Sequence, residues 1–108
     1  MHKLLLTALI ATPLAAWVSP ALAGAEEAMT KAGCMACHAK DKKLVGPSFQ
    51  QIAAKYKDSK GQDTRALLVQ KVRAGGKGVF GPIPMSPNGP DKIADADLGE
   101  AVAWILQQ

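Results

Sequence analysis

Apolar residues recur at helical spacing along most of the chain that follows residue 24. The stretch 48–57 shows this best, because its apolar residues stand at i, i+3, i+4 and i+7, on one face of an α-helix. These residues are Phe49, Ile52, Ala53 and Tyr56. No stretch alternates apolar and polar residues over the length of a half-buried strand. The pattern therefore predicts an all-α fold.

The same spacing predicts three further helices, about four in all. The first runs from Glu26 to about Ala36 and begins with two acidic residues, which favour a helix N-terminus. Another runs to Ala74 with Asp63 or Thr64 as its cap. Its inward residues are Leu67, Leu68 and Val72. The last is capped by Asp95 or Asp97. Its apolar stripe, flanked by Trp104, consists of Leu98, Val102, Ile105 and Leu106.

A loop over 75–90, GGKGVFGPIPMSPNGP, separates the last two predicted helices. It contains five glycines and four prolines. Each proline fixes its own φ and pushes the preceding residue towards extended conformations, so the loop is expected to be stiff and non-helical. Met85 lies in its middle. It either fills a gap in the core or is a sulfur held at a fixed place.

The first 23 residues have the anatomy of a secretory signal peptide. A basic start is followed by a mostly apolar run over 4–18 and by the small-x-small triplet Ala21-Leu22-Ala23. A retained membrane anchor is the alternative, but a spanning helix needs about 20 apolar residues, and this run is shorter and contains Pro13. We therefore expect cleavage after Ala23, a single domain over 24–108, and a location in the periplasm.

Cleavage would leave an 85-residue chain with little material for a core. Lys3 is lost, so 12 basic residues remain against 9 acidic ones, a net charge of +3. His38 is then the one histidine, and four aromatic residues remain. Hydrophobic burial alone stabilises so small a domain only marginally. The composition therefore indicates that another group fills the interior.

Both cysteines and His38 lie in the hexapeptide GCMACH, at 33–38. In a helix, Cys34, Cys37 and His38 share one face within about one turn, ~5 Å along the axis. Two thiols at this separation can each bond one vinyl group of haem, and the histidine can bind the iron from the same side; this is the C-x-x-C-H signature. A thioredoxin-like pair would require a βαβ context. Structural zinc usually requires four ligands. A simple disulfide would close too short a loop to stabilise much. Haem c is the favoured interpretation among the four.

A second axial ligand would have to be a methionine, because no second histidine remains. Met35 lies inside the attachment motif and Met29 upstream on the same predicted helix, where it is better explained by packing. Met85 is distant in sequence and can fold over the opposite face of the ring. Histidine with methionine raises the reduction potential and leaves no open position on the iron. The predicted chemistry is therefore outer-sphere transfer of one electron.

The segments GCMACHAKDKKLVGPSF and GVFGPIPMSPN, taken together and in order, resemble the small bacterial class I cytochromes c of the c-551 (cytochrome c8) type. The resemblance covers essentially all of 24–108. It implies a few helices around one covalent haem c, with the first and last helices crossing, and Gly33 and Trp104 where they pack closely. It also implies thioethers from Cys34 and Cys37 and axial ligation by His38 and Met85.

The resemblance assigns three further residues to the haem. The Pro47 carbonyl would accept a hydrogen bond from the other imidazole nitrogen of His38. Phe80 stands where close relatives carry a tryptophan that bonds a haem propionate, a bond that phenylalanine cannot make. Lys71 stands where relatives often carry a propionate-binding arginine, and it could act there as a point charge but not as a bidentate fork.

Charge and motif together predict a diffusible one-electron carrier, not an enzyme, between respiratory donors and a terminal reductase or oxidase. Its redox partners would present acidic surfaces to a lysine rim around the motif. That rim is Lys31, Lys40, Lys42, Lys43 and Lys77. An ordinary solvated surface explains the same lysines equally well. Nucleic-acid binding and a permanent membrane anchor are not expected. The alternatives are an open-site haem sensor or peroxidase-like protein, and the electron-accepting subunit of a dehydrogenase.

Overall fold

The computed structural model describes residues 11–14, 24–59 and 61–108, and the named elements among them are all helices. The order is α2 (Ala25–Lys31), a short 3-10 turn η1 (Cys34–Ala36), α3 (Phe49–Lys55), α4 (Gln62–Ala74) and α5 (Asp95–Ile105). The expected all-α class is confirmed. The predicted signal peptide and its cleavage site fall almost entirely outside the described residues.

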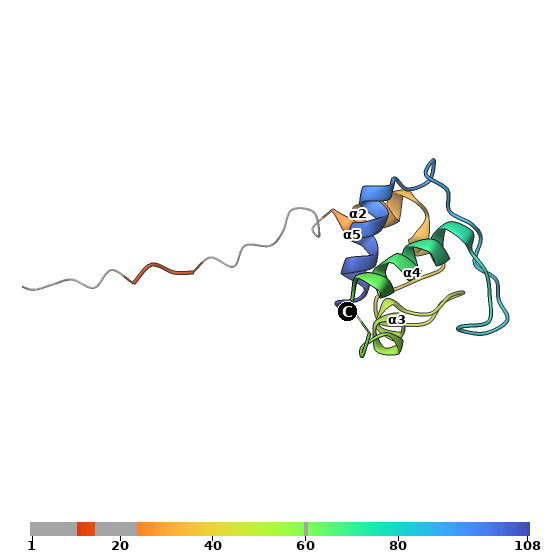
Figure 1. Cartoon of the computed structure of the whole chain (residues 1–108), viewed down its shortest axis with the longest axis horizontal. Coiled ribbons are helices and arrows are strands. Elements are labelled where there is room, and N and C mark those ends of the chain that lie inside the picture. Colours follow the sequence, from red (N-terminus) through yellow and green to blue (C-terminus); the bar gives the residue numbers. More distant parts are fainter. Residues whose placement is uncertain (1–10, 15–23, 60) are drawn as a thin grey trace, which may run out of the picture.

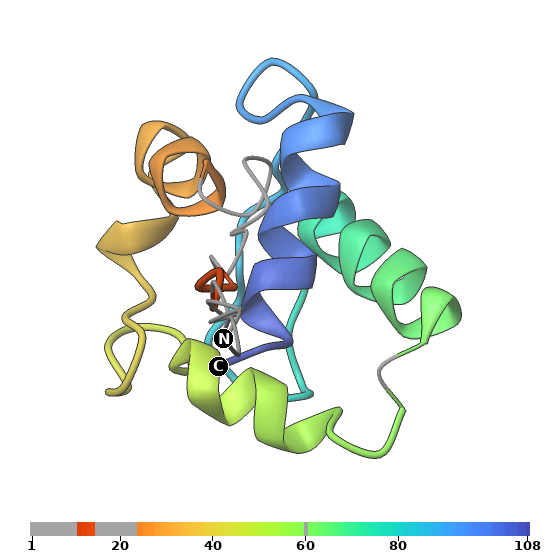
Figure 2. The same cartoon turned by 90° about the vertical axis from the view of Figure 1, so that its left-hand side faces the viewer.

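Helix α5 is the element around which the others are arranged. It packs against α2, α4 and α3, and Figure 2 shows it crossing the middle of the domain with the other helices around it. The predicted crossing of first and last helices is therefore observed. The buried apolar cluster is drawn from every helix and from the turn before α5. It consists of Met29, Phe49, Leu68, Ile93, Leu98, Ala101, Val102 and Leu106.

The predicted stripes of α3 and α5 are confirmed, but that of α4 is only partly so. Phe49 and Ala53 are buried, and Leu98, Val102 and Leu106 are exposed by 3% or less. On α4, Leu68 is buried and Val72 is half-buried against the cluster. Leu67, predicted to point inward, is 45% exposed. One face of α4 already meets α5 through Leu68, so Leu67, one position back, lies on a different side of that helix.

The first helix is shorter than predicted. It ends at Lys31, and Gly33 has φ +85°, in the left-handed region that glycine adopts readily. A β-carbon on Gly33 would meet no atom within 4 Å. The expectation that Gly33 permits close packing of helices is therefore wrong. Position 33 instead favours glycine because of its positive φ, which ends α2 and allows a separate turn to begin.

The helix starts also differ from prediction. Ser48 caps α3 in a reciprocal pair with Gln51, a capping box. Gly61 caps α4 and Ala94 caps α5, neither with a side-chain bond. The predicted caps Asp63, Asp95 and Asp97 lie in the first helical turn instead, where their charge favours the positive end of the helix dipole. Thr64, the alternative cap of α4, is buried.

Six large apolar side chains stay substantially exposed within the part of the domain described from residue 24 onward. They are Leu44, Val45, Leu67, Val79, Phe80 and Ile83. Leu44 and Val45 precede Gly46, and Val79, Phe80 and Ile83 belong to the loop of Met85. No helix among the described residues combines the length and apolar character needed to cross a membrane.

Candidate functional site

The imidazole of His38 is held by a hydrogen bond to the Pro47 backbone. Its Nδ1 lies 2.7 Å from the Pro47 carbonyl oxygen. A carbonyl oxygen can only accept, so this contact requires the proton on Nδ1. Neutral His38 then presents the lone pair of Nε2, the arrangement found in metal-ligating histidines. The bond that the resemblance implied is thus present in the structure.

Packing fixes the plane of the same ring. The Phe49 ring, 2% exposed, stacks on His38 with centroids 5.6 Å apart and 20° between the planes. Trp104 of α5 meets Phe49 edge-on, at 5.5 Å and 85°. A line of three rings therefore runs from His38 through α3 to the central helix. The resemblance placed Trp104 where the first and last helices pack, whereas its observed ring contact is with Phe49 of α3.

Gly46 lies against the His38 ring from another side. A β-carbon built there would stand 2.6 Å from Cε1 and 3.0 Å from Nδ1 of His38. The Gly46 amide donates to the Cys37 carbonyl at 2.8 Å, so the segment 44–47 is bonded directly to the motif. Only a residue without a side chain permits this approach.

Cys34, Cys37 and His38 occupy one tight turn, although not one long helix as predicted. The amides of Cys37 and His38 both donate to the Cys34 carbonyl, at 3.2 Å and 3.0 Å. One turn is sufficient for the i, i+3, i+4 relation, so the interruption at Gly33 leaves the predicted spacing intact.

The cysteines do not have the surroundings of a redox or metal pair. Both are free thiols; Cys34 is partly buried and Cys37 is exposed. Burial raises the pKa of the Cys34 thiol, whereas a catalytic thiol needs a lowered pKa. No group of three or more histidine, cysteine, aspartate or glutamate side chains is placed to hold a metal ion in the described ranges. The raised pKa of Cys34 therefore disfavours thiol redox chemistry relative to haem attachment.

Met85 is half-buried and its backbone is held in place. Its amide donates to the Gly76 carbonyl at 2.8 Å, and the Gly76 amide donates to the Met85 carbonyl at 3.0 Å. A β-carbon on Gly75 would collide with the Met85 carbonyl oxygen and lie 2.8 Å from the Pro87 nitrogen. In Figure 1 the loop of Met85 and the segment after His38 both extend towards the right-hand end of the domain.

Phe80 and Lys71 lie on elements that adjoin Met85. Phe80, in the Met85 loop, is 40% exposed, and the Lys55 ammonium of α3 stands 5.9 Å from its ring centroid, a cation–π contact. Lys71 is half-buried in the last turn of α4. Sequence reasoning missed Lys55, the stacking of Phe49 on His38, and the steric role of Gly46, which the resemblance gave only as part of the family's Gly-Pro pair. The steric demand on Gly46 was foreshadowed only by its place beside Pro47.

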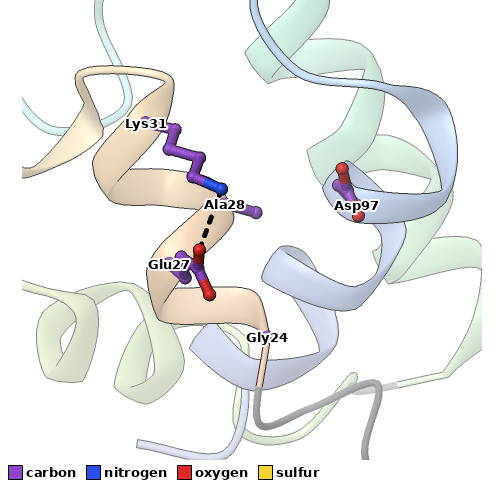
Figure 3. A pocket seen from close by; sticks show the side chains of 5 residues that line it. All are labelled: Gly24, Glu27, Ala28, Lys31 and Asp97. Atoms are coloured by element: carbon purple, nitrogen blue, oxygen red, sulfur yellow. Dashed lines mark ion pairs between the residues drawn. The ribbon is translucent and has the colours of Figure 1, made fainter.

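A separate surface hollow lies between α2 and the start of α5 and contains none of the motif residues. Glu27 and Lys31 form an i, i+4 ion pair of 2.8 Å beside it, with Asp97 facing them (Figure 3). The hydrogen bond and charge of Lys31 lower the pKa of Glu27, and the pKa of Lys31 is raised in return. Both groups are solvated, so the pair contributes little to stability.

Comparison with known proteins identifies the family. The Cytochrome c family profile matches residues 21–108. The chain is 48% identical over 81 residues to cytochrome c2 of Rubrivivax gelatinosus, which covers 75% of this chain and 93% of that protein. It is 49% identical over 81 residues to cytochrome c-551 of Pseudomonas denitrificans, with the same coverage. The chain belongs to the cytochrome c family. The crystal structure of Nitrosomonas europaea cytochrome c552 matches with a TM-score of 0.67 at 41% identity, covering 75% of this chain and 95% of that one.

Membership in this family means that the chain is an electron-transfer protein with one covalent haem c, not an enzyme. The residues present fit that group. Two thiols on one turn are available for thioether bonds, His38 has its Nδ1 proton engaged, and exposed apolar side chains flank the motif and line the Met85 loop. These apolar side chains offer the contacts that a porphyrin needs. A bound haem would therefore supply the additional core material that the composition led us to expect.

Proposed function

We propose that this cytochrome c is a diffusible carrier of single electrons in the periplasm, between respiratory donors and a terminal reductase or oxidase. The observation that carries the proposal is the His38 ring, placed in the C-x-x-C-H turn with Nδ1 hydrogen-bonded to the Pro47 carbonyl oxygen. Haem c supplies a reversible one-electron couple when bound. The residues around it would hold the iron, and transfer of an electron needs no protein group that makes or breaks bonds.

Five residues would hold the haem directly or through one contact. Cys34 and Cys37 would form the thioethers, His38 and Met85 would ligate the iron, and Pro47 would set the His38 tautomer. Met85 is supported by its half-buried position and by the two backbone bonds to Gly76. A thioether and an imidazole would occupy both axial positions and so oppose oxygen or peroxide binding.

Two further residues would adjoin the haem edge. Lys71 would contribute a positive charge near a propionate, without the bidentate bond of an arginine. Phe80 would contribute apolar contact only. Its cation–π partner Lys55 would keep it against α3.

A periplasmic location is supported by the organisation of the chain. The family profile begins at residue 21, and the alignment with cytochrome c2 leaves a quarter of this chain outside. The residues ahead of 24 have the basic, apolar and small-residue order of a signal peptide. We therefore propose 1–23 as a cleaved leader and 24–108 as the working domain. The N-terminal sequence of the exported protein tests this boundary.

The visible spectrum of the exported protein, with a denaturing gel stained for haem, tests the function. We expect haem that stays with the polypeptide, sharp α and β bands on reduction, and a weak far-red band from methionine bound to ferric iron. A high-spin spectrum that shifts with carbon monoxide would instead indicate an open site, and so a sensor or peroxidase-like protein. Absence of haem from a host able to attach it would overturn the proposal.

Acidic redox partners are supported by exposed lysines next to the motif. Lys40, Lys42 and Lys43 are exposed on the loop that follows His38. Lys31, predicted to share this role, is paired with Glu27 and therefore adds less net charge. We expect electron transfer to an acidic partner to slow as ionic strength rises, because the Debye length falls from about 30 Å at 0.01 M to about 3 Å at 1 M.

Reversing the charge of two lysines in this loop distinguishes electrostatic steering of the redox partner from a general effect of salt on the rate. The double substitution Lys42→Glu and Lys43→Glu should lower the low-salt rate constant about tenfold and flatten its salt dependence. The double substitution Lys57→Glu and Arg65→Glu, at two exposed basic residues beyond α3 and on α4, changes the net charge by the same amount and serves as the matched control. Equal effects of both changes, or a rate that is insensitive to salt, would refute steering by this loop. Stopped-flow measurement over a salt series provides the rates.

A further inference from the structure

The guanidinium of Arg73, in the last turn of α4, joins three segments of the chain. Its NH1 group donates to the carbonyl oxygens of Asn88, at 3.1 Å, and Ile93, at 2.7 Å. Its NH2 group donates to a carboxylate oxygen of Asp95 at 2.5 Å. The Arg73 side chain is 20% exposed and that of Asp95 is 88% exposed. The two carbonyl contacts are therefore the shielded part of this arrangement.

Asn88 connects Arg73 to the Met85 loop through hydrogen bonds. Its amide and its side-chain Nδ2 both donate to the Val72 carbonyl, at 3.1 Å and 3.4 Å, and Nδ2 also donates to the Ser86 carbonyl at 2.9 Å. Ser86 is the residue after Met85. The loop is thus fastened at its far end by Asn88 and Arg73, and nearer Met85 by the pairing with Gly76.

We propose that Arg73 is a positioning residue for Met85, acting through Asn88 on the far end of the loop. The proposal rests on the proposed ligation of the iron by Met85. Between Gly76 and Met85 the loop contains two glycines and two prolines, so its tip has few bonds of its own. Its placement depends on how its two ends are held. Arg73 sets the distance between the end of α4 and the turn that begins at Asn88.

The planar guanidinium suits this task better than an ammonium. One nitrogen reaches two carbonyl oxygens from different segments while the other faces Asp95, and the group keeps its charge at any relevant pH. A lysine at position 73 would carry a compact point charge and could not donate from two nitrogens held in one plane. The carboxylate of Asp95 is solvated, so its charge is expected to matter little.

The test compares Arg73→Gln and Arg73→Lys with two controls in the haem-loaded protein. Arg65→Gln removes an exposed arginine from the first turn of the same helix, and Asp95→Asn removes the solvated carboxylate. Two readouts report on Met85: the intensity of the far-red ferric band, and the affinity of ferric protein for added imidazole, which competes with methionine. Denaturant unfolding is measured in parallel.

We expect Arg73→Gln to weaken the far-red band and to raise imidazole affinity about tenfold, with Arg73→Lys between it and wild type. Both controls should stay within about twofold of wild type. A lower unfolding midpoint with band and imidazole affinity unchanged would mean a merely structural role and overturn the proposal. Should Arg73→Gln fail to fold, Arg73→Lys with unchanged imidazole affinity would overturn it equally. A wild-type protein without the far-red band would refute the ligation by Met85 itself, which is a distinguishable result.

Discussion

Met85→Ala is expected to abolish the far-red ferric band and to lower the reduction potential by a large share of the ~0.8 V range over which axial ligands act. The thioether is a weak donor that raises the potential, and alanine leaves that position to water or to an added ligand. The Met85 side chain is half-buried on a loop whose backbone is paired with Gly76. Absorption spectroscopy and redox titration provide the measurement.

Leucine variants separate the sulfur from the volume of the side chain. Met85→Leu retains an apolar chain of similar size but should lose the band completely, whereas Met35→Leu should retain it. Met35 packs against the core cluster within the motif turn, so it is a matched methionine in the same protein. A far-red band that persists in Met85→Leu would assign the ligand elsewhere and reopen the question of an open-site protein.

Gly46→Ala is expected to disturb His38, the other proposed ligand of the iron. The added methyl would stand 2.6 Å from Cε1 of His38, and that ring cannot retreat freely because Phe49 stacks on it. Overpacking of this kind destabilises by about 1–3 kcal/mol. We expect a lower free energy of unfolding and a weakened bond between His38 and Pro47, seen as a shifted potential. Denaturant titration and voltammetry measure the two effects.

Gly99→Ala is the matched control for this change. Gly99 is exposed within α5, and a β-carbon there would meet no atom within 4 Å. Replacing a helical glycine with alanine should stabilise by up to about 1 kcal/mol. Opposite signs for the two glycine variants would confirm that the requirement at 46 is steric. A neutral Gly46→Ala would show that the loop relaxes without moving His38.

Much of the helical architecture could be predicted from periodicity, because apolar faces that meet a common partner impose a 3.6-residue repeat. That argument located α3, α4 and α5 and the buried residues of α3 and α5. It failed at Leu67, since an apolar side chain is not obliged to face the protein core. It also failed at Gly33, because composition alone does not reveal a positive φ. The predicted N-caps were wrong as well, because the first residue of a helix such as α5 is fixed by the turn before it.

The candidate site divides in the same way. Local spacing in the C-x-x-C-H turn was sufficient to predict the attachment chemistry, and the proline-rich loop marked Met85. The contact between His38 and Pro47 was available only through family resemblance. The approach of Gly46, the stacking of Phe49 and the reach of Arg73 to Asn88 depend on how distant segments meet, and no local pattern encodes them.

The packing of α2 against α5 has a consequence for when the protein can fold. Ala25 and Asp95 begin these helices, 70 positions apart, yet the two helices share one buried cluster. A nascent chain therefore lacks half of its central interface until synthesis is almost complete. Contacts so distant in sequence form late, since a long loop must close first. The polypeptide is accordingly expected to lack its final packing while it is being made, a state that would suit the export proposed above.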